Sequence, residues 1–126
     1  MWKIIQKQEW ENYTRYIILN KYGSIIVDLF KEPQQWWDSS TKLGSVWIWG
    51  LYVVPKYRRK GYAKEFLREA EQLVFNKGHK AIFMAYRKNS TPKWTLDFYI
   101  REGYKVVEKD KGGFMLYKSI QEDFQA

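Results

Sequence analysis

Cationic residues beside a glycine are the part of this sequence whose types and spacing most directly indicate chemistry. Arg58, Arg59 and Lys60 are consecutive, and Gly61 follows them just before a segment with helical periodicity. The first turn of a helix has unpaired N–H groups and a partial positive charge, and a glycine lets a ligand approach the backbone closely. The segment therefore predicts an anion site that suits phosphate; the alternative is a basic turn that only faces solvent.

A buried strand and an amphipathic helix are expected on either side of this turn. Residues 46–54 form an apolar, β-branched and aromatic run, and Pro55 ends it. Gly50 interrupts the run, which predicts a bulge or a close backbone approach. A helix over 62–77 with a stop at Gly78 is predicted by apolar residues that repeat on one face: Phe66, Leu67, Ala70, Leu73 and Val74.

The spacing of the basic turn is similar to a known motif. Arg58-x-x-Gly61-x-Ala63 resembles the Q/R-x-x-G-x-G/A pattern of the GCN5-related N-acetyltransferases, the GNAT family, and Leu51-x-Val53-x-Pro55 stands just before it. Further residues match the family in order and spacing, so that the resemblance covers roughly residues 46–104: Asn89, Phe98-Tyr99 and Gly103-Tyr104.

The resemblance implies a mixed α/β fold. We expect a mostly antiparallel sheet of about seven strands, a central parallel β-α-β unit and two main helices. Only residues 7–12 leave room for helix before the second strand, so the N-terminal helices of the family are expected to be reduced. The other strands are expected over 2–6, 13–20, 24–30, 81–86, 104–109 and 114–118, with a loop over 31–45 and a second helix that ends at Gly103 and has Thr91 as its N-cap.

The resemblance also implies acetyl-CoA as a co-substrate. In the family, the loop after the central strand binds the pyrophosphate, and the backbone of that strand pairs with the pantetheine arm. Asn89 corresponds to a cofactor-contacting asparagine, although a residue that only leads into the helix is the alternative. The residues carried over are Leu51, Tyr52 and Val53 for the pantetheine arm, and Arg58, Arg59, Lys60, Gly61, Tyr62 and Ala63 for the pyrophosphate.

Tyr99 is the candidate general acid. A phenol with a pKa near about 10 is protonated at neutral pH, and it can donate to a thiolate whose conjugate acid has a pKa near about 8.5. The alternative is that Tyr99 only packs on a helix that already buries Trp94 and Phe98. A backbone N–H near Val53 is expected to polarise the thioester carbonyl.

The sequence does not identify a general base. No Asp or Glu lies between Gly44 and Val54, where many family members have one. Removal of the amine proton would therefore fall to water or to Asp28, Glu32 or Asp38.

Four tryptophans are candidates for an acceptor pocket. Trp36 and Trp37 are adjacent in the expected loop, and loops on a rigid scaffold often carry binding residues. Trp47 and Trp49 are two residues apart in the central strand and so share one face, where they could hold a cationic or apolar acceptor. The alternatives are that the first pair covers an end of the sheet and that the second pair packs in the core.

Length and composition exclude several classes of protein. A chain of 126 residues fits one domain, taken as residues 1–126, and apolar residues at 45% with aromatics at 19% exclude a disordered or collagen-like chain. There is no cysteine and one histidine, so we expect no disulfide, no metal site and no cysteine nucleophile. Charges near the N-terminus and the short apolar run argue against a signal peptide or a membrane span, and we expect a cytoplasmic protein.

The formal net charge of +8, from 22 basic and 14 acidic residues, indicates an anionic partner. The scattering of the remaining cations disfavours nucleic acid, and a homodimer stays open. The main hypothesis is an acetyl-CoA-dependent N-acetyltransferase that acts on an unidentified primary amine by direct attack in a ternary complex. The alternatives are a non-catalytic acyl-CoA-binding regulatory domain and a basic nucleic-acid-binding domain.

Overall fold

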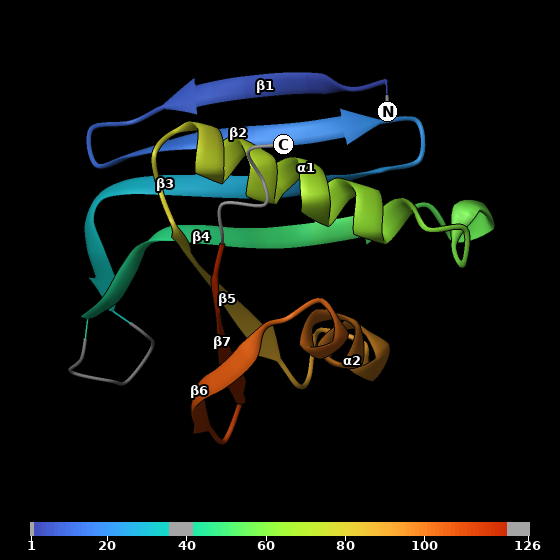
Figure 1. The fold of residues 1–126 in the computed structure, drawn as a ribbon. Helices are drawn as coiled ribbons and strands as arrows, with labels where there is room; N and C mark the ends of the chain where they lie inside the picture. Colours follow the sequence, from blue (N-terminus) through green and yellow to red (C-terminus); the bar gives the residue numbers. More distant parts are fainter. Residues whose placement is uncertain (1, 36–41, 121–126) are drawn as a thin grey trace.

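A computed structural model describes residues 2–35 and 42–120 of the chain. These residues form a seven-stranded sheet, two α-helices and one 3₁₀-helix (Figure 1). The strands are β1 (Ile4–Glu9), β2 (Tyr13–Asn20), β3 (Gly23–Gln35), β4 (Lys42–Val53), β5 (Ala81–Arg87), β6 (Lys105–Asp110) and β7 (Gly113–Ser119), and the helices are η1 (Pro55–Tyr57), α1 (Tyr62–Asn76) and α2 (Lys93–Arg101).

The sheet is mixed, as the sequence predicts. Its strand order is β1-β2-β3-β4-β5-β7-β6, and every neighbouring pair is antiparallel except β4 and β5. The first four strands run side by side, and β5, β7 and β6 cross their direction steeply (Figure 1). The parallel ladder between β4 and β5 is registered at one residue pair, Trp47 with Phe83. The two strands therefore diverge toward the C-terminal end of β4.

Gly50 forms a bulge in β4, which confirms the prediction for this glycine. Tyr52 pairs with Ser24 and Trp49 pairs with Ile26, so Gly50 and its neighbour Leu51 together oppose one residue of β3. Gly50 has a φ of 66°, a left-handed conformation that costs little without a Cβ.

The bulge determines which side chains of β4 reach each face of the sheet. Paired residues on neighbouring strands share a face, so Trp47, Trp49 and Tyr52 lie on one face and Ile48 and Val53 lie on the other. The Ile48 face carries the main core, to which α1 and α2 contribute Phe66, Leu67, Ala70, Val74, Phe98 and Tyr99. On the Trp47 face, Phe83 and Met115 form a smaller cluster with Trp47 and Tyr117 packed against it.

The structure moves several expected boundaries. The expected loop over 31–45 is wrong at both ends, because Gln34 pairs with Gly44 and the hairpin of β3 and β4 continues there. Pro33 is tolerated inside β3 because it lies where the ladder between these strands is irregular. The first strand is shifted to Ile4–Glu9 by its pairing with β2.

The predicted N-cap of the second helix is also wrong. The N-cap is Pro92, and no side chain caps the helix. The carbonyl of Thr91 instead accepts a hydrogen bond from the hydroxyl of Tyr86 at 3.2 Å. The reduced N-terminal region is confirmed, since only residues 10–12 separate β1 from β2. Within the described residues, neither helix has the length and hydropathy that a bilayer span requires.

Candidate functional site

The chain between β4 and α1 has a conformation that exposes backbone donors. Arg59 has a φ of 64°, which is uncommon for a residue with a side chain, and Gly61 at the N-cap of α1 has a φ of 87°. No side chain caps α1, and its first backbone bond is donated by Glu65 to the carbonyl of Gly61. The N–H groups of the first turn therefore remain available to an anion.

A cavity of about 540 Å³ opens at this loop, and we call it the loop cavity. A Cβ added at Gly61 would meet nothing within 4 Å, so this side of the loop offers open space rather than packed atoms. The residues that line it from β4, the chain between β4 and α1, and α1 are Val53, Tyr57, Arg58, Arg59, Gly61, Tyr62, Ala63 and Lys64.

Two groups of contacts hold the loop in place. The guanidinium Nε of Arg58 donates to the carbonyl of Val53 at 2.9 Å, which ties the basic turn to the end of β4. The ring of Tyr62 stacks on the ring of Tyr22 with a centroid distance of 4.0 Å. The ring of Tyr57 packs edge-on against the same Tyr22 ring, with a centroid distance of 4.7 Å. The backbone of this loop is thus braced before any ligand arrives.

The helix α2 supplies the opposite wall of the loop cavity. Trp94, Phe98 and Arg101 line it, and their spacing of four and three residues places them on one helical face. The sequence predicts Trp94 and Phe98 as packing residues and gives no site role to Arg101. Their i, i+4, i+7 spacing could have indicated a shared surface, but it does not indicate what that surface faces.

A second cavity, of about 280 Å³, lies where β4 and β5 diverge, and we call it the interstrand cavity. It shares Val53, Arg58 and Trp94 with the loop cavity, so the two cavities are neighbours. Its lining includes the predicted pantetheine contacts Leu51 and Tyr52 together with Tyr99, Thr91 and Ala85.

Tyr99 reaches the interstrand cavity from α2 and is 7% exposed. Burial raises the pKa of Tyr99 far above that of an exposed phenol, because the charged phenolate would lose its hydration. Its hydroxyl is therefore protonated throughout the physiological pH range and can donate a hydrogen bond.

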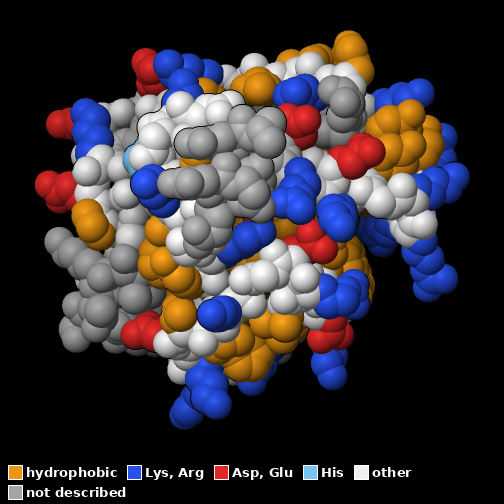
Figure 2. Space-filling model, viewed as in Figure 1, with side chains coloured by type: hydrophobic (Ala, Val, Ile, Leu, Met, Phe, Trp, Pro, Cys, Tyr) orange, Lys and Arg blue, Asp and Glu red, His pale blue; other side chains and the backbone are white. Residues whose placement is uncertain are grey.

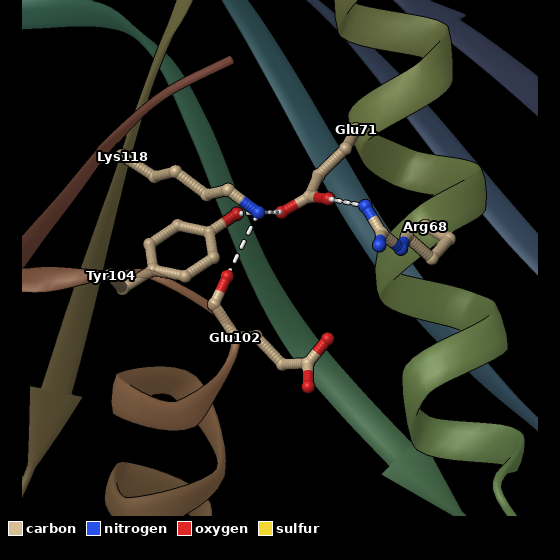
Figure 3. Close-up of polar contacts among 5 residues, drawn as sticks. All are labelled: Arg68, Glu71, Glu102, Tyr104 and Lys118. Atoms are coloured by element: carbon tan, nitrogen blue, oxygen red, sulfur yellow. Dashed lines mark hydrogen bonds and ion pairs between the residues drawn. The ribbon is translucent and has the colours of Figure 1, made fainter. Parts of the chain in front are cut away.

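A buried polar network anchors the end of α2 that follows Tyr99 (Figure 3). The hydroxyl of Tyr104 donates to Oε2 of Glu71 at 2.8 Å, and the backbone N–H of Tyr104 donates to the carbonyl of Tyr99 at 3.0 Å. Lys118 Nζ lies 3.0 Å from the same Glu71 oxygen and donates to the carbonyl of Glu102 at 2.8 Å. The network therefore joins α1 and β7 to the chain that directly follows α2, the helix that carries Tyr99.

A third cavity, of about 550 Å³, lies on the face of the sheet opposite α1, and we call it the aromatic cavity. Phe30, Trp47 and Trp49 line it. The two tryptophans of β4 that the sequence offers as candidates for an acceptor pocket therefore line the same cavity. The aromatic and interstrand cavities share five lining residues, and they meet where β4 and β5 separate: Ile48, Trp49, Gly50, Ala85 and Thr91.

Asp28 is the carboxylate among the described lining residues of the aromatic cavity, and it is 5% exposed. Arg15 binds it with two hydrogen bonds, Nε to Oδ1 at 2.8 Å and Nη2 to Oδ2 at 3.1 Å. Trp49 Nε1 also donates to Oδ2 at 2.9 Å. The guanidinium of Arg15 in turn lies 4.9 Å from the ring centroid of Trp49. The negative charge of Asp28 is therefore already balanced.

Other predicted residues fall outside these cavities or outside the described residues. Lys60 and Asn89 are exposed and are not among the residues that line the three cavities described above. Glu32 is exposed on β3. Trp36, Trp37 and Asp38 lie outside the described residues. The roles predicted for all of these residues stay predictions.

The sequence matches the acetyltransferase (GNAT) family over residues 7–104. No curated protein resembles the sequence closely enough to count as a match.

Solved structures with the same fold include three acetyltransferases. PaiA N-acetyltransferase from Thermoplasma acidophilum, in complex with coenzyme A, has a TM-score of 0.61 at 20% identity; the match covers 86% of this chain and 61% of that one. A Bacillus subtilis acetyltransferase in complex with CoA has a TM-score of 0.63 at 14% identity, with 94% and 99% covered. The ribosomal-protein-S18-alanine N-acetyltransferase from Escherichia coli has a TM-score of 0.61 at 12% identity, with 90% and 72% covered.

Proposed function

The chain belongs to the acetyltransferase (GNAT) family, and from this premise we propose that it transfers an acetyl group from acetyl-CoA to a primary amine by direct attack in a ternary complex. The observation that carries the proposal is a row of three neighbouring cavities that extends from one face of the sheet to the other. The loop cavity shares lining residues with the interstrand cavity, which in turn shares lining residues with the aromatic cavity on the opposite face. A donor and an acceptor can thus approach the same point from opposite faces.

The loop and the first turn of α1 fit a pyrophosphate. The free N–H groups after Gly61, the open space beside that glycine and the cations of Arg58 and Arg59 all favour a dianionic group there. Two solved structures with this fold are complexes with coenzyme A. We assign the pyrophosphate to residues 59–63 on these grounds.

The diverging end of β4 suits the pantetheine arm. Backbone groups of Leu51, Tyr52 and Val53 that point toward β5 have no strand to pair with beyond the Trp47 and Phe83 register. An extended amide-containing chain can pair with such groups as an added strand does. A backbone N–H in this segment would also polarise the thioester carbonyl.

Tyr99 is assigned as the donor to the leaving sulfur. The raised pKa keeps the hydroxyl protonated, so it can hydrogen-bond to the developing thiolate. The same shift makes Tyr99 a weaker acid than an exposed phenol, so its main contribution is stabilisation of the developing charge, with proton transfer completed as the thiol forms.

Water is the acceptor that we assign for the amine proton. Three donor contacts already occupy Asp28, out of about four positions that a carboxylate offers. Entry of an ammonium into an apolar cavity also lowers its pKa, because burial disfavours the charged form. The cavity therefore promotes loss of the proton without a dedicated base.

The test is release of free CoA thiol from acetyl-CoA in the presence of a panel of amines, with the acetylated product identified by mass spectrometry. Calorimetric titration with CoA measures cofactor binding separately. We expect CoA binding together with amine-dependent thiol release. CoA binding without transfer to any amine would favour the non-catalytic regulatory domain instead, and absence of CoA binding would overturn the assignment of the loop.

A further inference from the structure

The residues that line the aromatic cavity indicate which class of amine fits there. We propose that its occupant is a primary monoamine attached to a flat apolar body, such as an aryl ring. The ring would lie against Phe30, Trp47 and Trp49, and the nitrogen would point toward Gly50 and Ala85. This inference rests on the proposed acetyl transfer and names the class of amine for the same site.

Aromatic side chains form a large part of the cavity lining, which also includes the polar residues Gln34, Gln35 and Thr91. Phe30, Trp47 and Trp49 come from two neighbouring strands, and Ile48 adds further apolar surface. Trp47 is held in position because its Nε1 donates to the carbonyl of Gly44 at 2.9 Å and its ring packs 5.7 Å from that of Phe83. Rings fixed in this way favour offset or edge contacts with another ring.

The charges around the cavity favour an acceptor with a single positive charge over a polycation. Asp28 is paired with Arg15 and hydrogen-bonded to Trp49, so it does not offer its full charge to a ligand. The whole chain carries a net charge of +8. A polyamine or a lysine-rich peptide would therefore meet repulsion that Asp28, already paired with Arg15, does not fully offset.

Small residues mark the point where the nitrogen reaches the donor. Gly50 on β4 and Ala85 on β5 line both the aromatic and the interstrand cavity, so they lie where the two cavities meet. Ala85 is exposed although the residues on either side of it, Met84 and Tyr86, are buried. A nitrogen carried on a short linker can pass at this point, whereas the ring stays among the tryptophans.

Acetyl transfer forms one bond and breaks one, and each proton that moves has a donor and an acceptor. The neutral amine nitrogen attacks the thioester carbonyl carbon, a C–N bond forms and the C–S bond breaks. The sulfur leaves with the bonding electron pair and takes the proton of the Tyr99 hydroxyl as the thiol forms, and water returns a proton to Tyr99. The proton lost by the attacking nitrogen goes to water.

Three probes separate the possible acceptor classes: 2-phenylethylamine, ethylamine and spermidine. They share a primary amine and differ in the apolar body and in the number of charges. With acetyl-CoA saturating, we expect kcat/KM for 2-phenylethylamine to exceed the other two values by about tenfold or more. Calorimetry on the CoA-saturated protein should show 2-phenylethylamine binding that is similarly tighter than spermidine binding.

Substitutions locate the binding to this cavity. Trp47→Ala and Phe30→Ala are each expected to weaken 2-phenylethylamine binding by about tenfold while CoA binding stays unchanged. Two variants are used because Trp47 also packs against Phe83 and its loss could unfold part of the sheet. Trp2→Ala is the matched control, since Trp2 is 72% exposed.

The outcomes distinguish this inference from the proposed function. Acetylation of spermidine or ethylamine as efficient as that of 2-phenylethylamine would overturn the acceptor class and leave acetyl transfer standing. Specific binding of 2-phenylethylamine without acetyl transfer would support the aromatic site and would overturn the proposed enzymatic activity. Absence of 2-phenylethylamine binding, or binding that both cavity variants leave intact, would overturn the inference.

Discussion

The loop cavity and the aromatic cavity are built in different ways although both border β4. The loop cavity depends on backbone conformation: Arg59 and Gly61 have positive φ, and the donors are main-chain N–H groups. The aromatic cavity depends on side chains, with Phe30 and Asp28 from β3 and two tryptophans from β4. The loop cavity is formed largely by one continuous segment, whereas the aromatic cavity is formed by strands that pair in the sheet.

This difference separates the two binding functions physically. A side chain can change in the aromatic cavity without altering the φ and ψ angles of the loop. A change that disturbs the loop backbone alters phosphate binding whatever lines the other cavity. Donor affinity and acceptor preference should therefore respond to different substitutions, and the predictions below test that separation.

The largest effect is expected for Gly61→Glu, which should weaken CoA binding by about 10³-fold. The added carboxylate would occupy the open space beside the loop and repel the pyrophosphate, a cost of several kcal/mol. Gly78→Glu is the matched control, because Gly78 also has a positive φ and open space but lies beyond the other end of α1. Calorimetry decides the outcome, and equal affinities in both variants would remove the pyrophosphate assignment.

Tyr99→Phe should lower kcat by about 10²-fold with little change in CoA affinity. The substitution removes the hydroxyl and keeps the ring that packs against Phe98 and Tyr104. Tyr16→Phe, in the core of β2, is the control for loss of a hydroxyl elsewhere. Steady-state kinetics measure the effect, and an unchanged kcat would make Tyr99 a packing residue.

Tyr104→Phe should lower the free energy of unfolding by about 2 kcal/mol, because the buried carboxylate of Glu71 loses a charge-assisted hydrogen bond. The effect should depend on pH. Burial, followed by the nearby charge of Glu71, raises the pKa of Tyr104 above its ordinary value of 10.0, and burial also raises that of Tyr99.

Stability should therefore fall above about pH 10, since the unfolded chain releases these protons while the folded chain retains them. Each tyrosine contributes a slope of at most about 1.4 kcal/mol per pH unit. Urea unfolding at neutral and alkaline pH should show a shallower fall for Tyr104→Phe than for the unchanged protein. Equal slopes would mean that Tyr104 does not retain its proton in the folded state.

The smallest effect concerns salt. CoA binding should weaken only a few-fold between about 50 mM and about 200 mM salt, because few phosphates are neutralised, whereas a protein with six or more DNA phosphate contacts would lose about 10³-fold. Lys and Arg side chains are spread over the visible face with apolar patches between them (Figure 2). Tight duplex DNA binding with a steep salt dependence, not displaced by CoA, would overturn the cofactor assignment of the basic turn.

The sequence predicted those parts of the fold that local patterns determine. The alternating and continuous apolar runs located all seven described strands, and Gly50 indicated the bulge. The extension of β3 through Pro33 could not be predicted, because a proline is compatible with a strand only where the partner ladder is irregular, and that irregularity is a property of the pair.

In the candidate site, too, local patterns could be predicted from the sequence, whereas contacts between strands could not. The loop residues around Gly61 are contiguous, so their spacing, together with the strand before them and the helix after them, predicted an anion site at the turn where the loop cavity opens. The pairing of Asp28 with Arg15 and the contribution of Phe30 and Ala85 depend on the register of β3 with β2 and β4 and on the placement of β5. A single sequence gives each strand but not these registers.

The single register pair between β4 and β5 has a consequence for amide hydrogen exchange. Beyond Trp47 and Phe83, the N–H groups of the two strands that face each other across the opening have no partner strand. Those amides should exchange rapidly in the free protein, although amides of the same strands that bond to β3 and β7 exchange slowly. Saturating CoA should slow the exchange of the first group and leave the second unchanged, so the exchange pattern along β4 would report ligand binding residue by residue.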